Sequence, residues 1–153
     1  GIFSLVTASV LIRSGRSLGL PHLDISFVGT TGALDEIYIS WNTQQLTPTT
    51  VGKTLELSFY CALIRGDISP INAFHFWHDE FDSGGGELLF TSNADIPLVY
   101  GKHAGDPKLN RENVTNTEAT CAKIEAGLTF GFAAGVAADF TLRFWMPSIR
   151  RVS

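Results

Sequence analysis

Apolar and polar residues alternate along several short segments of the chain. In residues 36–41 the apolar side chains include Ile37, Ile39 and Trp41, and in residues 55–61 every odd position is apolar. A period of two places one side chain in a core and the next at a wetter surface, which is typical of a strand in an antiparallel sheet. Signals that start and stop a helix are scarce, so the pattern predicts an all-β fold.

The alternating segments and the turn residues between them predict eight strands. Glycine or proline occurs in intervening segments such as 29–32, 66–70 and 82–86, where these residues supply turn conformations. Residues 101–118 are polar and contain Pro107, so we expect a long loop there. The predicted strands are Ser4–Arg13, Leu23–Val28, Asp35–Asn42, Thr54–Ile64, Asn72–His78, Glu87–Thr91 with an extension through Pro97 to Tyr100, Thr120–Thr129 and Ala137–Met146.

Eight antiparallel strands favour a jelly-roll β-sandwich, with residues 1–153 forming a single domain. An immunoglobulin sandwich is the alternative, but Cys61, Trp77 and Cys121 do not have the spacing of that family. Both cysteines lie in apolar or alternating segments, and we expect them to be reduced core thiols. The last strand is expected to end at Pro147, because proline has no N–H to contribute to a sheet.

Composition narrows the function classes. Charged residues make up 17% of the chain and the net charge is -4, so the chain lacks the clustered lysines and arginines of a basic nucleic-acid-binding module. No apolar run reaches the roughly 18–20 residues of a membrane span, and we expect no membrane association. The chain begins at Gly1 without Met or the basic start of a signal peptide, which indicates either a fragment or a product of proteolysis.

The densest polar cluster is residues 75–82. His75 and His78 are three positions apart, and on a strand they would point to opposite faces, so we expect a solvated strand end rather than a metal site. A calcium site around Asp79 and Asp82 is the alternative, but the spacing differs from that of a calcium-binding loop. The tripeptide formed by residues 65–67, Arg-Gly-Asp, is expected to be a tight turn.

No catalytic constellation is evident in the sequence. The Gly-x-Ser-x-Gly motif of α/β-hydrolases is missing, and the histidines, which include His22 and His103, have no recognisable partner pattern. The sequence therefore predicts a protein that is not an enzyme, with no catalytic residue, no metal and no cofactor.

Two segments resemble coat proteins of picorna-like plant viruses, of the nepovirus and comovirus type. The first is Ile96–Pro107, IPLVYGKHAGDP, and the second is Phe140–Arg150, FTLRFWMPSIR. The resemblance implies a structural capsid subunit that packs with copies of itself and with companion jelly rolls into an icosahedral shell enclosing RNA. It also implies cleavage from a polyprotein, residence in the virion, and passage through the host cytoplasm during assembly.

On that resemblance, contacts between subunits would use exposed aromatic residues and the loop of residues 101–118. A low charge fraction fits a surface that is buried in a particle, and an isolated subunit would then tend to associate. Contact with RNA would be weak and independent of sequence, through Arg143, Arg150 and Arg151. The candidate contacts between subunits are Trp77, Phe81, Lys102, His103, Asp106, Trp145 and Met146.

The alternative function is a carbohydrate-binding or lectin-like β-sandwich. Trp41, Trp77 or Tyr100 would then serve as a platform on which a sugar ring stacks, although the alternation places Trp41 on the apolar face of its strand. A jelly-roll enzyme is the third hypothesis, and the missing metal triad disfavours it.

Overall fold

The computed structural model describes residues 9–32, 35–45 and 52–152, and these residues form strands and loops without a helix. Nine strands are present in this part of the chain. They are β1 (Ser9–Ser17), β2 (Leu20–Thr30), β3 (Asp35–Gln45), β4 (Thr54–Arg65), β5 (Ile71–Phe81), β6 (Glu87–Ser92), β7 (Lys108–Thr115), β8 (Lys123–Phe132) and β9 (Ala137–Arg151).

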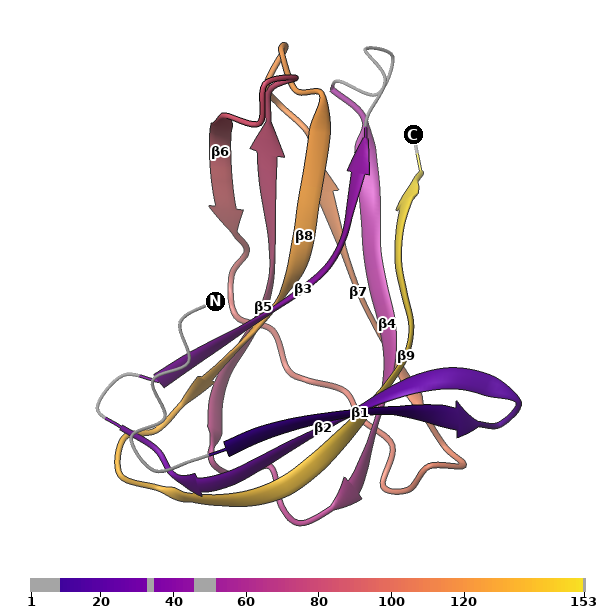
Figure 1. The fold of residues 1–153 in the computed structure, drawn as a ribbon, viewed down its shortest axis with the longest axis vertical. Helices are drawn as coiled ribbons and strands as arrows, with labels where there is room; N and C mark the ends of the chain where they lie inside the picture. The colour runs from indigo at the N-terminus through magenta and orange to yellow at the C-terminus, as the bar shows by residue number, and fades with distance from the viewer. Residues whose placement is uncertain (1–8, 33–34, 46–51, 153) are drawn as a thin grey trace.

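The strands form two antiparallel sheets that pack face to face (Figure 1). One sheet has the order β1-β2-β9-β4-β7 and the other has the order β3-β8-β5-β6. Strands that follow one another in the sequence mostly belong to opposite sheets, and β2 to β9 make up the jelly roll, with β1 added beside β2. The predicted all-β jelly-roll sandwich is confirmed, but the predicted number of eight strands was wrong.

Strand β7 is the one that the alternation missed, because it lies inside the segment predicted to be a loop. Only Asn110 and Val114 are buried in it, so it has no apolar period of two. The side-chain oxygen of Asn110 accepts a hydrogen bond from the N–H of Val99 at 2.9 Å, and its NH₂ group donates to the carbonyl of Val99 at 2.7 Å. A buried amide replaces the usual apolar side chain, and its partner lies outside the strand. The predicted extension from Pro97 to Tyr100 is not a strand.

Strand β9 continues through Pro147, contrary to the predicted end of that strand. Trp145 pairs with Tyr60 and Ser148 pairs with Ser58, so β9 contains one residue more than β4 between the same two pairs. This extra residue is a β-bulge, which removes the need for an N–H at the proline. Met146 in the bulge has a φ of 50°, a backbone conformation that residues other than glycine rarely adopt.

The core between the sheets is built largely from phenylalanine. The rings of Phe27 and Phe140 are stacked with centroids 4.8 Å apart, and those of Phe59 and Phe76 are 5.6 Å apart. All four side chains are at most 1% exposed, and they belong to one cluster with residues from both sheets. The alternation of apolar residues along the strands supplies this cluster, because each strand turns one face toward it.

Two smaller predictions are confirmed. Cys61 and Cys121 are both buried and free. Arg65 is the last residue of β4, and Gly66 and Asp67 begin the short connection to β5, where Gly66 has a φ of 80° that favours glycine.

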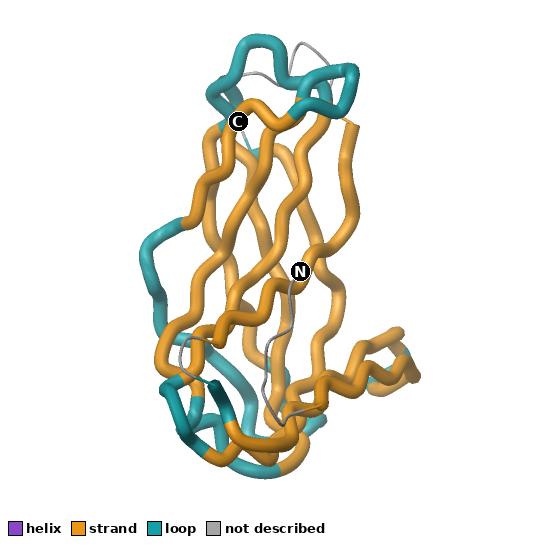
Figure 2. Tube along the Cα trace, turned by 60° about the vertical axis from the view of Figure 1, so that its left-hand side comes forward, coloured by secondary structure: helices purple, strands orange, loops and turns teal. Residues whose placement is uncertain are grey.

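The hairpin of β1 and β2 projects from the side of the sandwich (Figure 2). Its exposed tip carries Leu18 and Leu20. None of the described segments is a helix that could cross a membrane.

Candidate functional site

Three aromatic rings lie in a row on the outer face of the four-stranded sheet. We call Tyr38 of β3, Trp77 of β5 and Phe90 of β6 the aromatic row. The centroid of Trp77 is 6.4 Å from that of Tyr38 and 6.1 Å from that of Phe90. Tyr38 is 37% exposed and Phe90 is 45% exposed, whereas Trp77 between them is 5% exposed. The row therefore presents two open rings on either side of a central indole.

Gly127 of β8 lies under the indole of Trp77 and makes this arrangement possible. The strand register pairs Gly127 with Trp77 on one side and Ser40 on the other. A Cβ at this position would lie 2.0 Å from the carbonyl oxygen of Ile39 and 2.7 Å from the nearest atom of the Trp77 ring. Only glycine leaves room for the ring at this place, so the sequence of β8 sets the position of a side chain on β5.

Three polar atoms on this face are buried and have no hydrogen-bond partner in the described part of the chain. They are Nε1 of Trp77, Oγ1 of Thr129 and Oδ1 of Asp79. Trp77 and Asp79 are on β5, and Thr129 of β8 pairs with both Tyr38 and His75. Because buried polar groups are nearly always satisfied, these three atoms are exceptions on this face.

Carboxylates flank the aromatic row. The hydroxyl of Tyr38 donates to Glu36 at 2.7 Å, and the hydroxyl of Ser40 donates to Glu125 at 2.5 Å. Burial raises the pKa of Asp79 to about 6, and the charges of Glu87 and Glu125 add to the rise. The amino group of Lys123 lies 4.8 Å from the ring centroid of Phe81 at the end of β5. The face thus offers hydrogen-bond acceptors beside aromatic rings, with Lys123 at one end.

We expect Asp79→Asn to raise the free energy of unfolding more at pH 8 than at pH 4. The pKa of Asp79 is higher in the folded protein than in the unfolded chain, so folding is opposed once pH rises through about 6 and the carboxylate ionises. Thermal unfolding of both proteins at the two pH values measures this. The matched variant Glu87→Gln should lower the pKa of Asp79, because it removes a neighbouring negative charge. An equal change in stability on Asp79→Asn at pH 4 and at pH 8 would contradict the prediction.

The outer face of the five-stranded sheet carries a second group of rings, which is more closed. Trp145 pairs with His22 on one side and Tyr60 on the other. Trp145 is only 1% exposed, and the guanidinium of Arg143 lies 5.8 Å from the centre of its ring. Arg143 also donates two hydrogen bonds to Asp24, at 2.6 and 2.7 Å. Only Tyr60, at 37%, is an exposed ring of this group.

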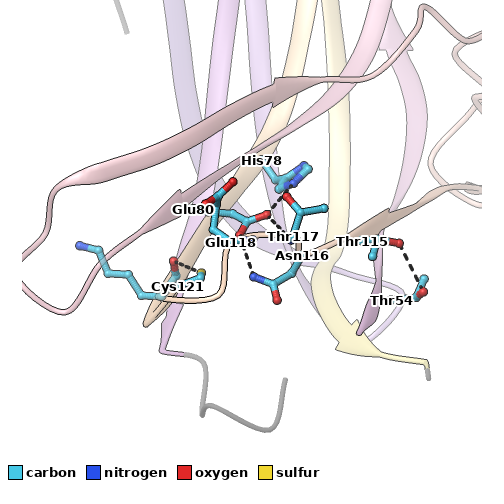
Figure 3. A network of polar contacts seen from close by, with 9 residues as sticks. Thr54, His78, Glu80, Thr115, Asn116, Thr117, Glu118 and Cys121 are labelled. Carbon is cyan, nitrogen blue, oxygen red and sulfur yellow. Dashed lines mark hydrogen bonds and ion pairs between the residues drawn. The ribbon is translucent and has the colours of Figure 1, made fainter. Parts of the chain in front are cut away.

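A buried polar network lies between β5 and the segment after β7 (Figure 3). Glu80 is fully buried, and its carboxylate accepts hydrogen bonds from the side chain of Asn116 and the backbone N–H groups of Thr117 and Glu118, at 2.8 to 2.9 Å. Nε2 of His78 is 3.7 Å from the same carboxylate, and burial lowers the pKa of His78. Glu80 therefore ties the segment after β7 to β5.

This network corrects the prediction of a solvated strand end. Residues 75–81 belong to β5, and His78 and Glu80 point inward, whereas His75 points outward and contacts Asp95 at 3.0 Å. The two histidines do lie on opposite faces, as the strand pattern predicted. Among the described residues, no group of three or more His, Cys, Asp or Glu side chains could hold a metal ion.

The structure places the predicted contact residues at several separate positions. Trp77 is in the aromatic row, and Phe81 is half-buried below Lys123. Trp145 and Met146 are on β9, where Met146 is 53% exposed. Lys102, His103 and Asp106 lie in the loop between β6 and β7, where Asp106 contacts Lys108 at 2.6 Å.

The arginines proposed to contact RNA are on β9. Arg143 pairs with Asp24, and Arg150 donates a hydrogen bond to Glu56 at 2.8 Å. Arg151 is exposed near the end of the strand. The charges of Arg143 and Arg150 are therefore already balanced by carboxylates of neighbouring strands.

Of the three proposed stacking residues, Trp77 lies on the face described above. Tyr100 is partly buried and packs against the core, and the side chain of Trp41 lies outside the described part of the chain. Sequence reasoning missed Tyr38 and Phe90. Tyr38 shares the polar face of its strand with Glu36 and Ser40, and this alternation could have predicted that its ring lies on the outer face of the sheet.

Comparison with known proteins gives similarity in fold only. No family model matches the sequence, and no curated protein matches it. Three solved structures are similar over 95–96% of this chain, at 12–16% sequence identity. The first is the enzymatically active domain of tailspike protein 4 from bacteriophage CBA120, at 12% identity and a TM-score of 0.56.

The other two are carbohydrate-binding modules. One comes from a study of promiscuous specificity in modules of the β-sandwich superfamily, at 16% identity and a TM-score of 0.54. The other is the CBM22-1 xylan-binding domain of Xyn10C from Paenibacillus barcinonensis, at 16% identity and a TM-score of 0.50. This chain spans 18% of the tailspike chain, 54% of the first module's chain and 82% of the xylan-binding domain.

These matches overturn the predicted coat-protein function, together with the icosahedral shell that it implied. The two segments that carried the viral resemblance serve the jelly roll itself. Gly101 exchanges backbone hydrogen bonds with β4, at 3.0 Å to Cys61 and 2.8 Å to Leu63, and residues 140–150 are the central strand of the five-stranded sheet. Both viral capsid and lectin domains use this fold, so such segments indicate the fold and not the function.

Proposed function

We propose that this chain is a non-catalytic carbohydrate-binding module that holds a glycan against the aromatic row. The face has the two kinds of group that a sugar requires. The open rings of Tyr38 and Phe90 offer flat apolar surfaces for the C–H face of a pyranose. The carboxylates and hydroxyls beside them offer partners for the sugar hydroxyls.

The observation that carries this proposal is the exposure of Tyr38 and Phe90 on one sheet face, on either side of Trp77 and beside the carboxylates of Glu36 and Glu125. A ligand bearing both C–H faces and hydroxyl groups is able to use the rings and the carboxylates together, whereas a purely apolar partner would leave the carboxylates without new partners. The fold shared with a xylan-binding domain and another carbohydrate-binding module supports the same proposal.

The charge of the face suggests which glycans it holds. Glu36, Asp79 and Glu125 lie beside the row, and Lys123 is at its end. An anionic sugar would be repelled by the three carboxylates. We therefore expect neutral polysaccharides such as xylan or mannan to bind more tightly than polygalacturonate.

The test compares two tyrosines of equal exposure on opposite faces. Tyr38 and Tyr60 are both 37% exposed, and they belong to the four-stranded and five-stranded sheets respectively. Glycan-array screening selects the ligand, and calorimetric titration then measures its affinity. We expect Tyr38→Ala and Phe90→Ala to weaken binding about tenfold or more, and Tyr60→Ala to leave it unchanged.

Other outcomes count against the proposal. Equal losses for Tyr38→Ala and Tyr60→Ala would show that the aromatic row is not the site. A larger loss for Tyr60→Ala would move the site to the five-stranded sheet, and the absence of binding to every glycan tested would reject the function itself.

A further inference from the structure

We propose that His75, held in place by Asp95, accepts a hydrogen bond from a sugar hydroxyl beside the aromatic row. The inference rests on the proposed glycan-binding function and adds a polar subsite that the rings alone do not provide. His75 would contact the glycan, and Asp95 would be a positioning residue. The ligand class that this subsite favours is a glycan whose hydroxyl at that place is unsubstituted.

The strand register places His75 next to the rings of the aromatic row. Thr129 of β8 pairs with Tyr38 on one side and with His75 on the other. Tyr38 and His75 are therefore two strand spacings apart, which is roughly 10 Å between their backbones. His75 and Trp77 are two residues apart on β5 and so lie on the same face of the sheet. A sugar that stacks on Tyr38 would thus have His75 at its side.

Asp95 fixes the orientation of the imidazole. Nδ1 of His75 lies 3.0 Å from Oδ1 of Asp95. An ionised carboxylate only accepts hydrogen bonds, so Nδ1 carries the hydrogen, and in the neutral ring Nε2 is left as an acceptor. The N–H of Ile96 donates to the carbonyl of Phe74 at 2.8 Å, which holds the segment that carries Asp95 along the edge of β5. The acceptor is therefore set by contacts that exist before a ligand arrives.

Nε2 of His75 is within reach of a ligand. The side chain is 12% exposed, and Nε2 has no hydrogen-bond partner among the described residues. Unlike Nε1 of Trp77 and Oγ1 of Thr129, it is not one of the buried unpartnered atoms, so it keeps accessible surface. Because the two ring nitrogens lie on different sides of the imidazole, Nε2 is turned away from Asp95 and out over the face. His75 thus presents a fixed acceptor that solvent, or a sugar, can contact.

The shape of a stacked sugar explains why a group at its side decides which sugar binds. The equatorial hydroxyls of a pyranose lie close to the plane of its ring, so stacking on an aromatic face directs them sideways along the sheet. A hydroxyl that points toward Nε2 of His75 donates its hydrogen to the ring nitrogen. An ether at the same place has no hydrogen to donate and adds a methyl group. The subsite therefore favours an unsubstituted hydroxyl.

The first part of the experiment titrates variants calorimetrically with xylohexaose and with mannohexaose. We expect His75→Phe, which keeps a ring but loses the acceptor, to weaken binding about five- to tenfold. His75→Gln should recover part of the affinity because its amide has an acceptor. Asp95→Ala should weaken binding about threefold, because the imidazole is no longer held. The matched control is His103→Phe, which should leave the affinity unchanged, since His103 is exposed in the loop between β6 and β7.

The second part uses nitrogen NMR of the unsubstituted protein, so it does not depend on a variant that folds. We expect the free protein to carry the ring hydrogen of His75 on Nδ1. Addition of the hexasaccharide that binds more tightly should then move the Nε2 signal. A side chain that only supports the fold would not show this shift.

Three results would overturn the role of His75. These are a ring hydrogen on Nε2 in the free protein, an Nε2 signal that does not move at saturation, and equal affinity in His75→Phe and His103→Phe. If Tyr38→Ala still weakens binding in those cases, the proposed function stands without this subsite. If the unsubstituted protein binds neither hexasaccharide nor any glycan of the array, the proposed function is rejected and the role of His75 with it.

Discussion

Replacing Gly127 with alanine is expected to destabilise the protein by about 3 kcal/mol and to abolish glycan binding at the same time. The added Cβ would lie 2.0 Å from the backbone carbonyl oxygen of Ile39, so either the pairing of β3 with β8 or the path of β8 must change. The same atom would lie 2.7 Å from the ring of Trp77 and displace the centre of the aromatic row.

The control is Gly131→Ala in the same strand. There the added Cβ would approach the side chains of Ala73 and Asn72, at 3.0 and 3.2 Å, and would avoid backbone overlap. We expect a loss of about 1 kcal/mol and unchanged glycan affinity. Urea unfolding gives both free energies. Equal losses of stability in the two variants would show that contact with the Ile39 carbonyl is not the cause. If Gly127→Ala still binds glycan, the position of Trp77 does not matter for the site.

Glu80→Ala is expected to cost about 4 kcal/mol of unfolding free energy. The substitution removes the acceptor for three hydrogen bonds, from the side chain of Asn116 and from the N–H groups of Thr117 and Glu118. Those donors would remain in the folded protein without the carboxylate, and leaving buried donors unpaired costs more than the bonds themselves contribute.

Glu87→Ala is the control for the loss of a carboxylate, because Glu87 is exposed at the start of β6. It should change stability by no more than about 0.5 kcal/mol. Glu80→Gln keeps one acceptor but turns an NH₂ group toward a donor, so its loss of stability should lie between those of Glu80→Ala and Glu87→Ala. Hydrogen exchange of the Thr117 and Glu118 amides should accelerate in Glu80→Ala. A loss below about 1 kcal/mol would mean that the segment after β7 is held by other contacts.

Strands with clean alternation could be predicted from the sequence because burial of one face leaves a local pattern. The strands β3 and β4 were found in this way, with ends within a few residues. In β7 the pattern fails because Asn110 is buried, and its partner Val99 lies eleven residues away outside any strand. Glu80 was interpreted as solvated for the same reason, since its donors are 36 to 38 residues distant.

The candidate site was predicted in part. Trp77 was recognised as an aromatic residue available for contact, but Tyr38 and Phe90 come from two other strands and join it through the sheet register. Register depends on pairing between segments far apart in sequence, which alternation does not show. The small residue that seats Trp77, Gly127, carries no chemistry of its own and gave no signal.

The position of β9 has a consequence for how the protein is made. This strand is the last of the described strands along the chain, yet it lies between β2 and β4 in the five-stranded sheet. While a ribosome is still adding residues 137–151, β2 and β4 have emerged with their inner edges unpaired, and such edges are prone to aggregation. The five-stranded sheet therefore closes only after synthesis of β9, and a chain stalled before Ala137 would expose the edges of β2 and β4 that β9 covers.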